Sequence, residues 1–270
     1  MSAAIYVLLL CYMVAALIGH VIFWTKRQYL TASLIAALSL GFALQIFVLL
    51  HDLIAIGHVW GSASFNFVFV LSLLWTGAAL LVFALTRKTV MALFAGPLAL
   101  LCLGAAAALP GTVSMGEAHH LKSVWLSAHI HLMLLAYAAL GLGFICALAY
   151  LGTAFRLQRK MLMPSAASLS LESLNRWVQL LSTVGVILLS FGLMAGWVWA
   201  DLSWQGAWLL DPKIMASLQA WALSAVVVVL RSRGKLQGRL GMWLIILSFG
   251  LILLGLLLDQ MIPSTYHHFL

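Results

Sequence analysis

The sequence contains few charged residues and too few cysteines for a disulfide framework. Only 7% of its 270 residues are Asp, Glu, Lys or Arg, and six acidic residues stand against fourteen basic ones. Cys11, Cys102 and Cys146 form no CxxC motif, so we expect no disulfide scaffold and no thiol relay, only small packing residues. Because 65% of the residues are apolar, a soluble domain is excluded.

Long apolar runs take up most of the sequence. Eight of them are long enough to cross a bilayer as helices, which requires roughly 20 apolar residues each. They lack the alternation of barrel strands, so we predict an all-α fold, a polytopic membrane helix bundle with about eight transmembrane helices in a single integral membrane domain, 1–270. The predicted helices cover residues 2–24, 30–51, 65–85, 90–109, 124–155, 177–200, 213–231 and 240–261.

The basic residues predict how these helices are oriented. Twelve of the fourteen lie in every second loop, and loops rich in Lys and Arg face the cytoplasm. Both the N- and C-termini and the loop after the sixth helix are therefore expected on the outer side. The net charge of +8 then reflects topology and contact with anionic lipid headgroups, and we expect no nucleic-acid partner.

Tryptophan is concentrated in one stretch of the chain. Five of the eleven tryptophans lie between Gly196 and Trp221, whereas an interfacial belt would scatter them over all helix ends. Indole rings stack on flat groups and donate through their N–H, so the density favours a flat aromatic surface that holds a planar ligand. Asp211 and Pro212 in this stretch also fit an ordinary helix start, an N-cap followed by proline.

The histidines gather toward the predicted outer face, where all nine except His20 are expected. His129, Met133 and Tyr137 are four residues apart in the fifth helix and share one face, which would line a cavity wall. His131 points to a different side. For His20 two interpretations stay open, an intramembrane functional group or a side chain that reaches water or a carbonyl near the helix end.

Other histidines have plainer interpretations. His51 precedes Asp52, whose carboxylate could fix the imidazole tautomer, but an ordinary wet helix end also explains the pair. His119 and His120 lack ligands at helical or hairpin spacing, which is typical of solvated loop residues. An aromatic surface with imidazoles from opposite sides suits haem iron better than zinc, which needs a compact tetrahedral set.

The tryptophan-rich stretch resembles the signature of the cytochrome c assembly family of membrane haem-handling proteins, in its CcsA and HemX-like branch. This WWD-type signature reads roughly G-x-V-W-A-x-x-x-W-G-x-x-W-x-W-D-P-K-E, with a further tryptophan seven residues on. The matching residues are Gly196, Val198, Trp199, Ala200, Trp204, Trp208, Asp211, Pro212, Lys213 and Trp221. Gln205, Leu210 and Ile214 depart from the signature, so one stacking ring and one carboxylate are missing.

The fifth helix resembles a second motif of the same family, W-L-x-x-H-x-x-x-M-x-x-x-Y-A-x-L. The resemblance implies that His129 is one axial ligand of haem iron and that His267 or His268 is the second. The resemblance to the family is closest over residues 124–270, which form the expected haem-handling core and include the tryptophan-rich loop 196–221. It is looser over residues 1–110, the HemX-like N-terminal helices. The motif is present as Trp125, Leu126, His129, Met133, Tyr137, Ala138 and Leu140.

The looser N-terminal resemblance includes His51, which comes before a helix with an L-S-x-x-W pattern at Leu71, Ser72 and Trp75. Relatives that move haem across the membrane carry another histidine in the seventh helix. Here no histidine lies between Trp221 and Tyr266. The resemblance therefore leaves two possibilities, an inner site served by His20 or no inner site.

The resemblance implies a haem-binding protein of the bacterial inner membrane that acts in cytochrome c biogenesis at the periplasmic face. Non-covalent haem b would stack on the tryptophans, with Lys213 or Lys122 meeting the propionates, and would be presented to apocytochrome c or a periplasmic assembly partner. No side chain offers an obvious acid or base, so we expect no catalysis by this chain alone. The expected cofactor-contacting residues are Trp197, Trp199, Trp204, Trp208, Asp211, Lys213 and Tyr137.

Two other functions stay open at this point. A HemX-like accessory or regulatory protein of haem metabolism, without catalysis, is favoured by the small size of the chain, by Ile214 in place of the signature glutamate and by the missing histidine in the seventh helix. A small ion or metabolite transporter is a weaker alternative, because the third and fourth helices contain no charge and no inverted repeat of broken helices is visible.

Overall fold

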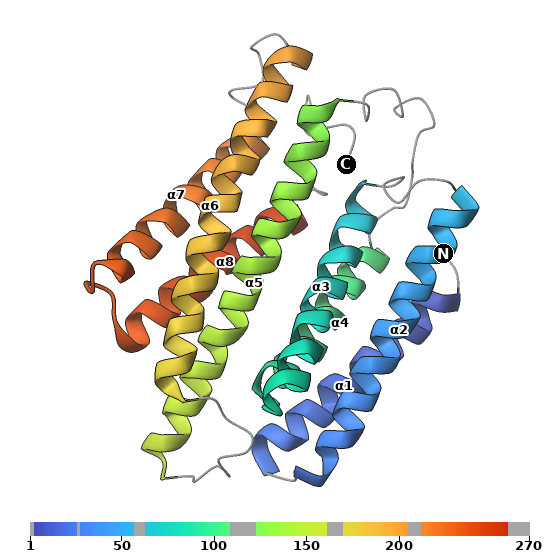
Figure 1. Ribbon diagram of the computed structural model, residues 1–270, viewed down its shortest axis with the longest axis vertical. Coiled ribbons are helices and arrows are strands. Elements are labelled where there is room, and N and C mark those ends of the chain that lie inside the picture. The colour runs from blue at the N-terminus through green and yellow to red at the C-terminus, as the bar shows by residue number, and fades with distance from the viewer. Residues whose placement is uncertain are drawn as a thin grey trace. The chain divides into compact units, whose positions relative to one another are not determined.

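The computed structural model confirms the all-α prediction (Figure 1). It describes residues 3–25, 28–56, 63–108, 123–160, 170–204 and 212–258, and within these ranges it contains helices and no strand. All eight predicted helices are present. They are α1 (Ala3–Thr25), α2 (Thr31–Ile56), α3 (Ala63–Thr86), α4 (Val90–Ala108), α5 (Val124–Gln158), α6 (Leu171–Trp204), α7 (Pro212–Ser232) and α8 (Gly238–Leu258).

Seven of the described helices are long and apolar enough to cross a membrane, and α4 has a shorter apolar segment, Val90–Gly104. The largest difference from the predicted boundaries is in α6, which begins at Leu171 and ends at Trp204 instead of covering 177–200. Charged residues, Arg176 and Asp201, flank the predicted range. In the structure, Arg176 pairs with Glu172 one turn earlier, which supports a helix there, and Asp201 is exposed on the last turns.

The chain forms two compact units. Unit 1 consists of Met1–Val113 and Gly152–Leu171, and so contains α1 to α4 with the last turns of α5. Helices α1 and α4 approach closely at Gly96, where a Cβ would lie 3.0 Å from the backbone nitrogen of Ala16. Small residues permit such contacts between membrane helices, where van der Waals packing drives association.

A closed hydrogen-bond network joins α1, α2 and α3 inside unit 1. The Tyr12 hydroxyl donates to Gln45 Oε1 over 2.7 Å, and Gln45 Nε2 donates to Ser72 Oγ at 2.5 Å and to the Phe69 carbonyl at 2.9 Å. The Thr76 hydroxyl donates to the Ser72 carbonyl. Because Tyr12, Gln45, Ser72 and Thr76 are 0% exposed, the network fixes how these helices pair, in surroundings where an unsatisfied polar group would be costly.

Unit 2 consists of Ser114–Leu151 and Glu172–Leu270, and so contains most of α5 with nearly all of α6 and the whole of α7 and α8. Helices α5 and α6 run antiparallel along each other (Figure 1), with Leu140 against Gly185 and Met133 against Gly192. Helix α8 contacts α5 through Phe144 and Phe249, whose ring centroids are 5.2 Å apart. These contacts bring the start of α5 and the end of α6 to the same end of unit 2.

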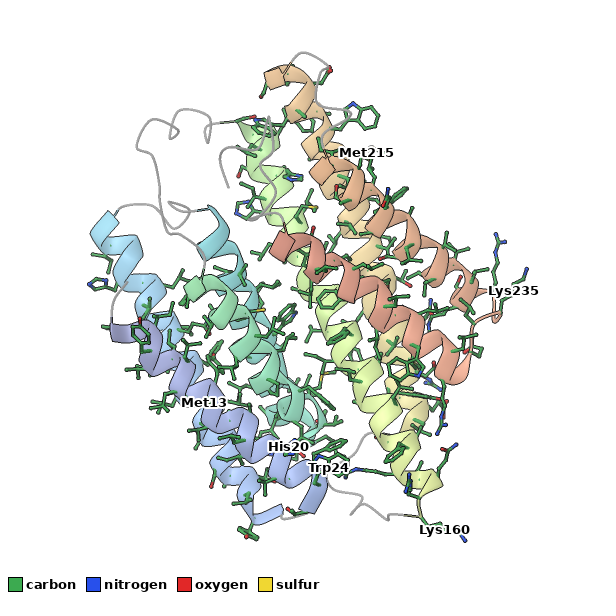
Figure 2. All side chains as sticks on the ribbon, turned by 180° about the vertical axis from the view of Figure 1, so that it is seen from behind. Met13, His20, Trp24, Lys160, Met215 and Lys235 are labelled. Atoms are coloured by element: carbon green, nitrogen blue, oxygen red, sulfur yellow. The ribbon has the colours of Figure 1, made fainter. Side chains whose placement is uncertain are left out.

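Two polar contacts attach α7 to α6. In the middle of α7, Trp221 Nε1 donates to Ser190 Oγ over 2.8 Å. At the C-terminal end of α7, buried Arg231 donates from Nη2 to Asn175 Oδ1 over 3.0 Å. The chain then turns into α8 through Gly234, whose φ of 74° is a conformation that glycine adopts without strain, and Lys235 lies in this turn (Figure 2).

Candidate functional site

His129 of α5 lies against α6 at the first residue of the tryptophan-rich stretch. Its Nδ1 is 2.7 Å from the carbonyl oxygen of Gly192. A carbonyl oxygen only accepts, so Nδ1 of the neutral ring carries the proton and Nε2 carries the lone pair. Histidines that bind metals are typically oriented in this way, with the second ring nitrogen donating to a carbonyl or carboxylate.

Gly196 provides the space that the His129 ring occupies. A Cβ at this position would lie 2.5 Å from Nδ1 and 2.8 Å from Cε1 of the ring, so any other residue would push the imidazole away. The signature glycine therefore has a physical reason in this protein. The sequence placed His129 and Gly196 in separate motifs, and the only sequence signal for their contact is the recurrence of Gly185, Gly192 and Gly196 along one side of α6.

Met133 and Tyr137 follow His129 along the same face of α5, as their spacing predicted. Met133 is 8% and Tyr137 is 7% exposed, and the Met133 sulfur lies against Gly192, where a Cβ would come within 3.0 Å of it. This face is thus packed in unit 2 and is not the wall of an open cavity. His129 is the polar group on this face nearest the N-terminal end of α5.

His131 points to a different side of α5, which confirms the expectation for it. Its ring is exposed, and Nδ1 lies 2.6 Å from the carbonyl oxygen of Ser127, one turn earlier in the same helix. His131 is therefore oriented by its own helix, whereas His129 is oriented by α6. This difference makes His131 a matched control for His129.

The expectation of one flat aromatic surface is wrong for Trp197 and Trp199. Trp197 is 56% exposed and Trp199 is 7% exposed. Both lie in α6, and residues two positions apart point about 200° apart around a helix, so the two rings face different surroundings. Trp204 forms the last residue of α6, and its side chain lies outside the described part.

Several predicted site residues lie wholly or partly outside the described residues. Lys213 belongs to the first turn of α7, but its side chain lies outside the described residues. The α7 helix does begin at Pro212, which confirms the predicted proline at the first helical position. The residues wholly outside the described ranges are Trp208, Asp211, Lys122, His119, His120, His267 and His268.

The two secondary candidates, His20 and His51, both lie in unit 1 and are exposed. The His20 ring is tilted against that of Trp24, with centroids 6.2 Å apart (Figure 2). The His51 ring is similarly placed beside Phe47 at 6.3 Å. Each histidine thus has an aromatic neighbour one turn earlier or later in its own helix.

The described residues contain no group of three or more His, Cys, Asp or Glu side chains that could hold a metal ion. Haem iron has different needs, because the porphyrin supplies four ligands and the protein one or two axial ones. A single imidazole with a fixed tautomer, against a glycine that leaves room for the ring, fits an axial haem ligand.

Together the fold and the site define a polytopic helical membrane protein in which an oriented histidine meets the start of a tryptophan-rich stretch. The chain matches the family described as Cytochrome C assembly protein over residues 1–267. It therefore belongs to this family.

Similar curated proteins are named cytochrome c biogenesis protein CcsA. The one from Prochlorococcus marinus (strain MIT 9313) is 34% identical over 189 residues, which cover 59% of this chain and 59% of that protein. Those from Manihot esculenta and Solanum lycopersicum are each 28% identical, and the matches cover 50% and 54% of this chain and 55% and 58% of the relative. The matched part thus spans less than two thirds of each relative.

Proposed function

We propose that this protein binds haem b non-covalently at the end of unit 2 where α5 begins and α6 ends, and that it handles or delivers haem in cytochrome c biogenesis. The observation that carries the proposal is the geometry of His129. Its Nδ1 is held by the Gly192 carbonyl at 2.7 Å, and its ring occupies the space that Gly196 leaves. A preset tautomer and a preset ring position are what an axial imidazole needs.

The other residues take supporting roles in this proposal. His267 or His268 supplies the second axial ligand, and exposed Trp197 offers a face for stacking on the porphyrin. Lys213 or Lys122 pairs with the propionates. Bound haem is the cargo, which an apocytochrome or a periplasmic assembly partner receives, and none of the residues assigned here acts as an acid or a base.

The distribution of basic residues supports a site on the outer side of the inner membrane. In unit 2, Arg176 lies near the start of α6, and Arg231, Arg233 and Lys235 lie at the end of α7 or just after it. This is the end of the helices opposite to His129. Because loops rich in Lys and Arg stay in the cytoplasm, His129 and the tryptophan-rich stretch face outward.

A HemX-like accessory or regulatory protein of haem metabolism is the second candidate function. It is favoured by Leu210 and Ile214, which replace a tryptophan and a glutamate of the signature, and by the lack of histidine between Trp221 and Tyr266. In this case haem would be sensed at the same site, without delivery to an apocytochrome.

Deletion followed by complementation separates these functions. Loss of cytochrome c with normal total haem supports haem delivery, whereas changed levels of haem-synthesis enzymes with intact cytochrome c support the accessory function. Complementation with His129→Ala is expected to fail, and with His131→Ala to succeed, because only His129 is oriented by α6. Full cytochrome c formation with His129→Ala would contradict haem delivery through this site.

A further inference from the structure

Unit 1 contains a cluster of aromatic and basic side chains to which neither the family signature nor the proposed haem site assigns a role. The guanidinium carbon of Arg156, in the last turn of α5, lies 4.1 Å from the centroid of the Phe23 ring of α1. The Phe23 ring also contacts Trp24 edge-on at 5.4 Å and Phe94 of α4 at 6.1 Å. Gly152, one turn before Arg156, leaves room for the ring, since a Cβ there would lie 3.3 Å from it.

Arg156 is a buried cation that has no anionic partner among the described side chains. The residue is 5% exposed, and its Nη1 is enclosed and has no hydrogen-bond partner among the described residues. Stacking on Phe23 stabilises the flat face of the guanidinium, but the N–H groups point outward in its plane and need acceptors. A buried charge is costly unless an opposite charge accompanies it, so the site calls for an anion at the guanidinium edge.

The position of Arg156 indicates which anion this is. The residue lies at the end of a membrane-crossing helix and is followed by exposed Arg159 and Lys160, with Lys160 at the same end of unit 1 as Trp24 (Figure 2). Trp24 is 57% exposed, as is typical of tryptophans at the headgroup level. Along α1, exposed Leu17 and Val21 continue from Trp24 as an apolar surface that acyl chains can cover.

We propose that Arg156, stacked on Phe23, binds the phosphate of an anionic phospholipid headgroup in the cytoplasmic leaflet. A guanidinium forms paired hydrogen bonds to phosphate, Arg159 and Lys160 add attraction for a negatively charged lipid, and the Trp24 ring packs beside the headgroup. The site is independent of haem, because none of its residues belongs to the haem site proposed above.

Lipid binding to the full-length, delipidated protein in detergent tests the proposal. Phosphatidylglycerol, phosphatidylcholine and inorganic phosphate are added separately, and lipid binding is followed by native mass spectrometry and thermal stability. We expect phosphatidylglycerol to bind more tightly than phosphatidylcholine, and Arg156→Gln to weaken its binding about tenfold or more, as expected for loss of charge-assisted hydrogen bonds. Phe23→Leu, which keeps the charge, serves as a second variant if Arg156→Gln fails to fold, and it should reduce the preference for the anionic lipid.

The matched control is Arg176→Gln, since Arg176 is exposed and pairs with Glu172 within its own helix. Loss of one surface charge weakens anionic lipid binding by about fivefold at most. Equal losses in Arg156→Gln and Arg176→Gln, or an unchanged preference in Phe23→Leu, would overturn the proposed site. Stabilisation by inorganic phosphate equal to that by phosphatidylglycerol would overturn the lipid assignment in favour of a free anion.

Discussion

In unit 1 the intramembrane polar side chains hydrogen-bond to one another, whereas in unit 2 one imidazole is held by the backbone of a neighbouring helix. Gln45 connects Tyr12 and Ser72 at 0% exposure, so this network has a structural role. His129 is only partly buried and is oriented by the Gly192 carbonyl. The comparison teaches that a polar residue in a membrane helix indicates function when its neighbours orient it without enclosing it.

Among the variants that test this comparison, Gly196→Ala is expected to have the largest effect, a decrease in haem affinity. The added methyl would lie 2.5 Å from His129 Nδ1, so the imidazole must move away from the Gly192 carbonyl. Loss of such an orienting contact weakens metal binding by about 10–100-fold, and we expect this decrease in haem affinity from hemin titration of the purified variant.

Gly250→Ala in α8 is the matched control for this substitution. A Cβ at Gly250 would meet no atom within 4 Å, so haem affinity should stay at the wild-type value. Unchanged haem affinity in Gly196→Ala, with the helices intact by circular dichroism, would show that the contact between Gly196 and His129 does not orient a ligand.

Gln45→Leu tests the structural role of the polar network in unit 1. The substitution leaves the Tyr12 hydroxyl and the Phe69 carbonyl without the partner that Gln45 provides, and we expect a loss of about 1–2 kcal/mol in the free energy of unfolding. Haem affinity should not change. The control is Gln219→Leu, at an exposed position of α7, which should not change the free energy of unfolding. A loss of haem binding in Gln45→Leu would contradict the conclusion that the network in unit 1 is structural and that haem binds in unit 2.

A smaller effect is expected at the contact between α6 and α7. Trp221 belongs to the family signature, yet its indole N–H donates to Ser190 over 2.8 Å, which indicates that it anchors α7. Ser190→Ala and Trp221→Phe should each lower stability by about 0.5–1 kcal/mol. In denaturant unfolding, the double variant should lose no more than one single variant, and fully additive losses would show that the two residues do not interact.

Hydropathy and spacing predicted the helices and the order of residues along α5. Apolar runs can be recognised as membrane helices without knowing which helices pack against them. The four-residue spacing of His129, Met133 and Tyr137 places them on one face of any α-helix. The start of α7 at Pro212 followed from local backbone chemistry in the same way. These features depend only on residues close in sequence.

Contacts between helices could not be predicted, because they depend on how each helix is rotated. The contact of His129 with Gly196 joins residues of two helices, and so does the bond between Tyr12 and Gln45. Trp197 and Trp199 lie inside the predicted helix 177–200, so helix periodicity already turns their side chains apart. Which of the two is buried depends on how α6 is rotated, and the structure shows that it is Trp199. Asp201 marks the predicted end of this helix, but α6 continues past it to Trp204, because the charge is exposed near the end of the helix.

The absorption spectrum of the detergent-purified protein with added hemin tests haem binding through His129 most directly. We predict a Soret band that is lost or shifted in His129→Ala and unchanged in His131→Ala, with a further change when His267 and His268 are both replaced by alanine. No Soret band above that of free hemin, or a band that is the same in the wild type and His129→Ala, would contradict this assignment.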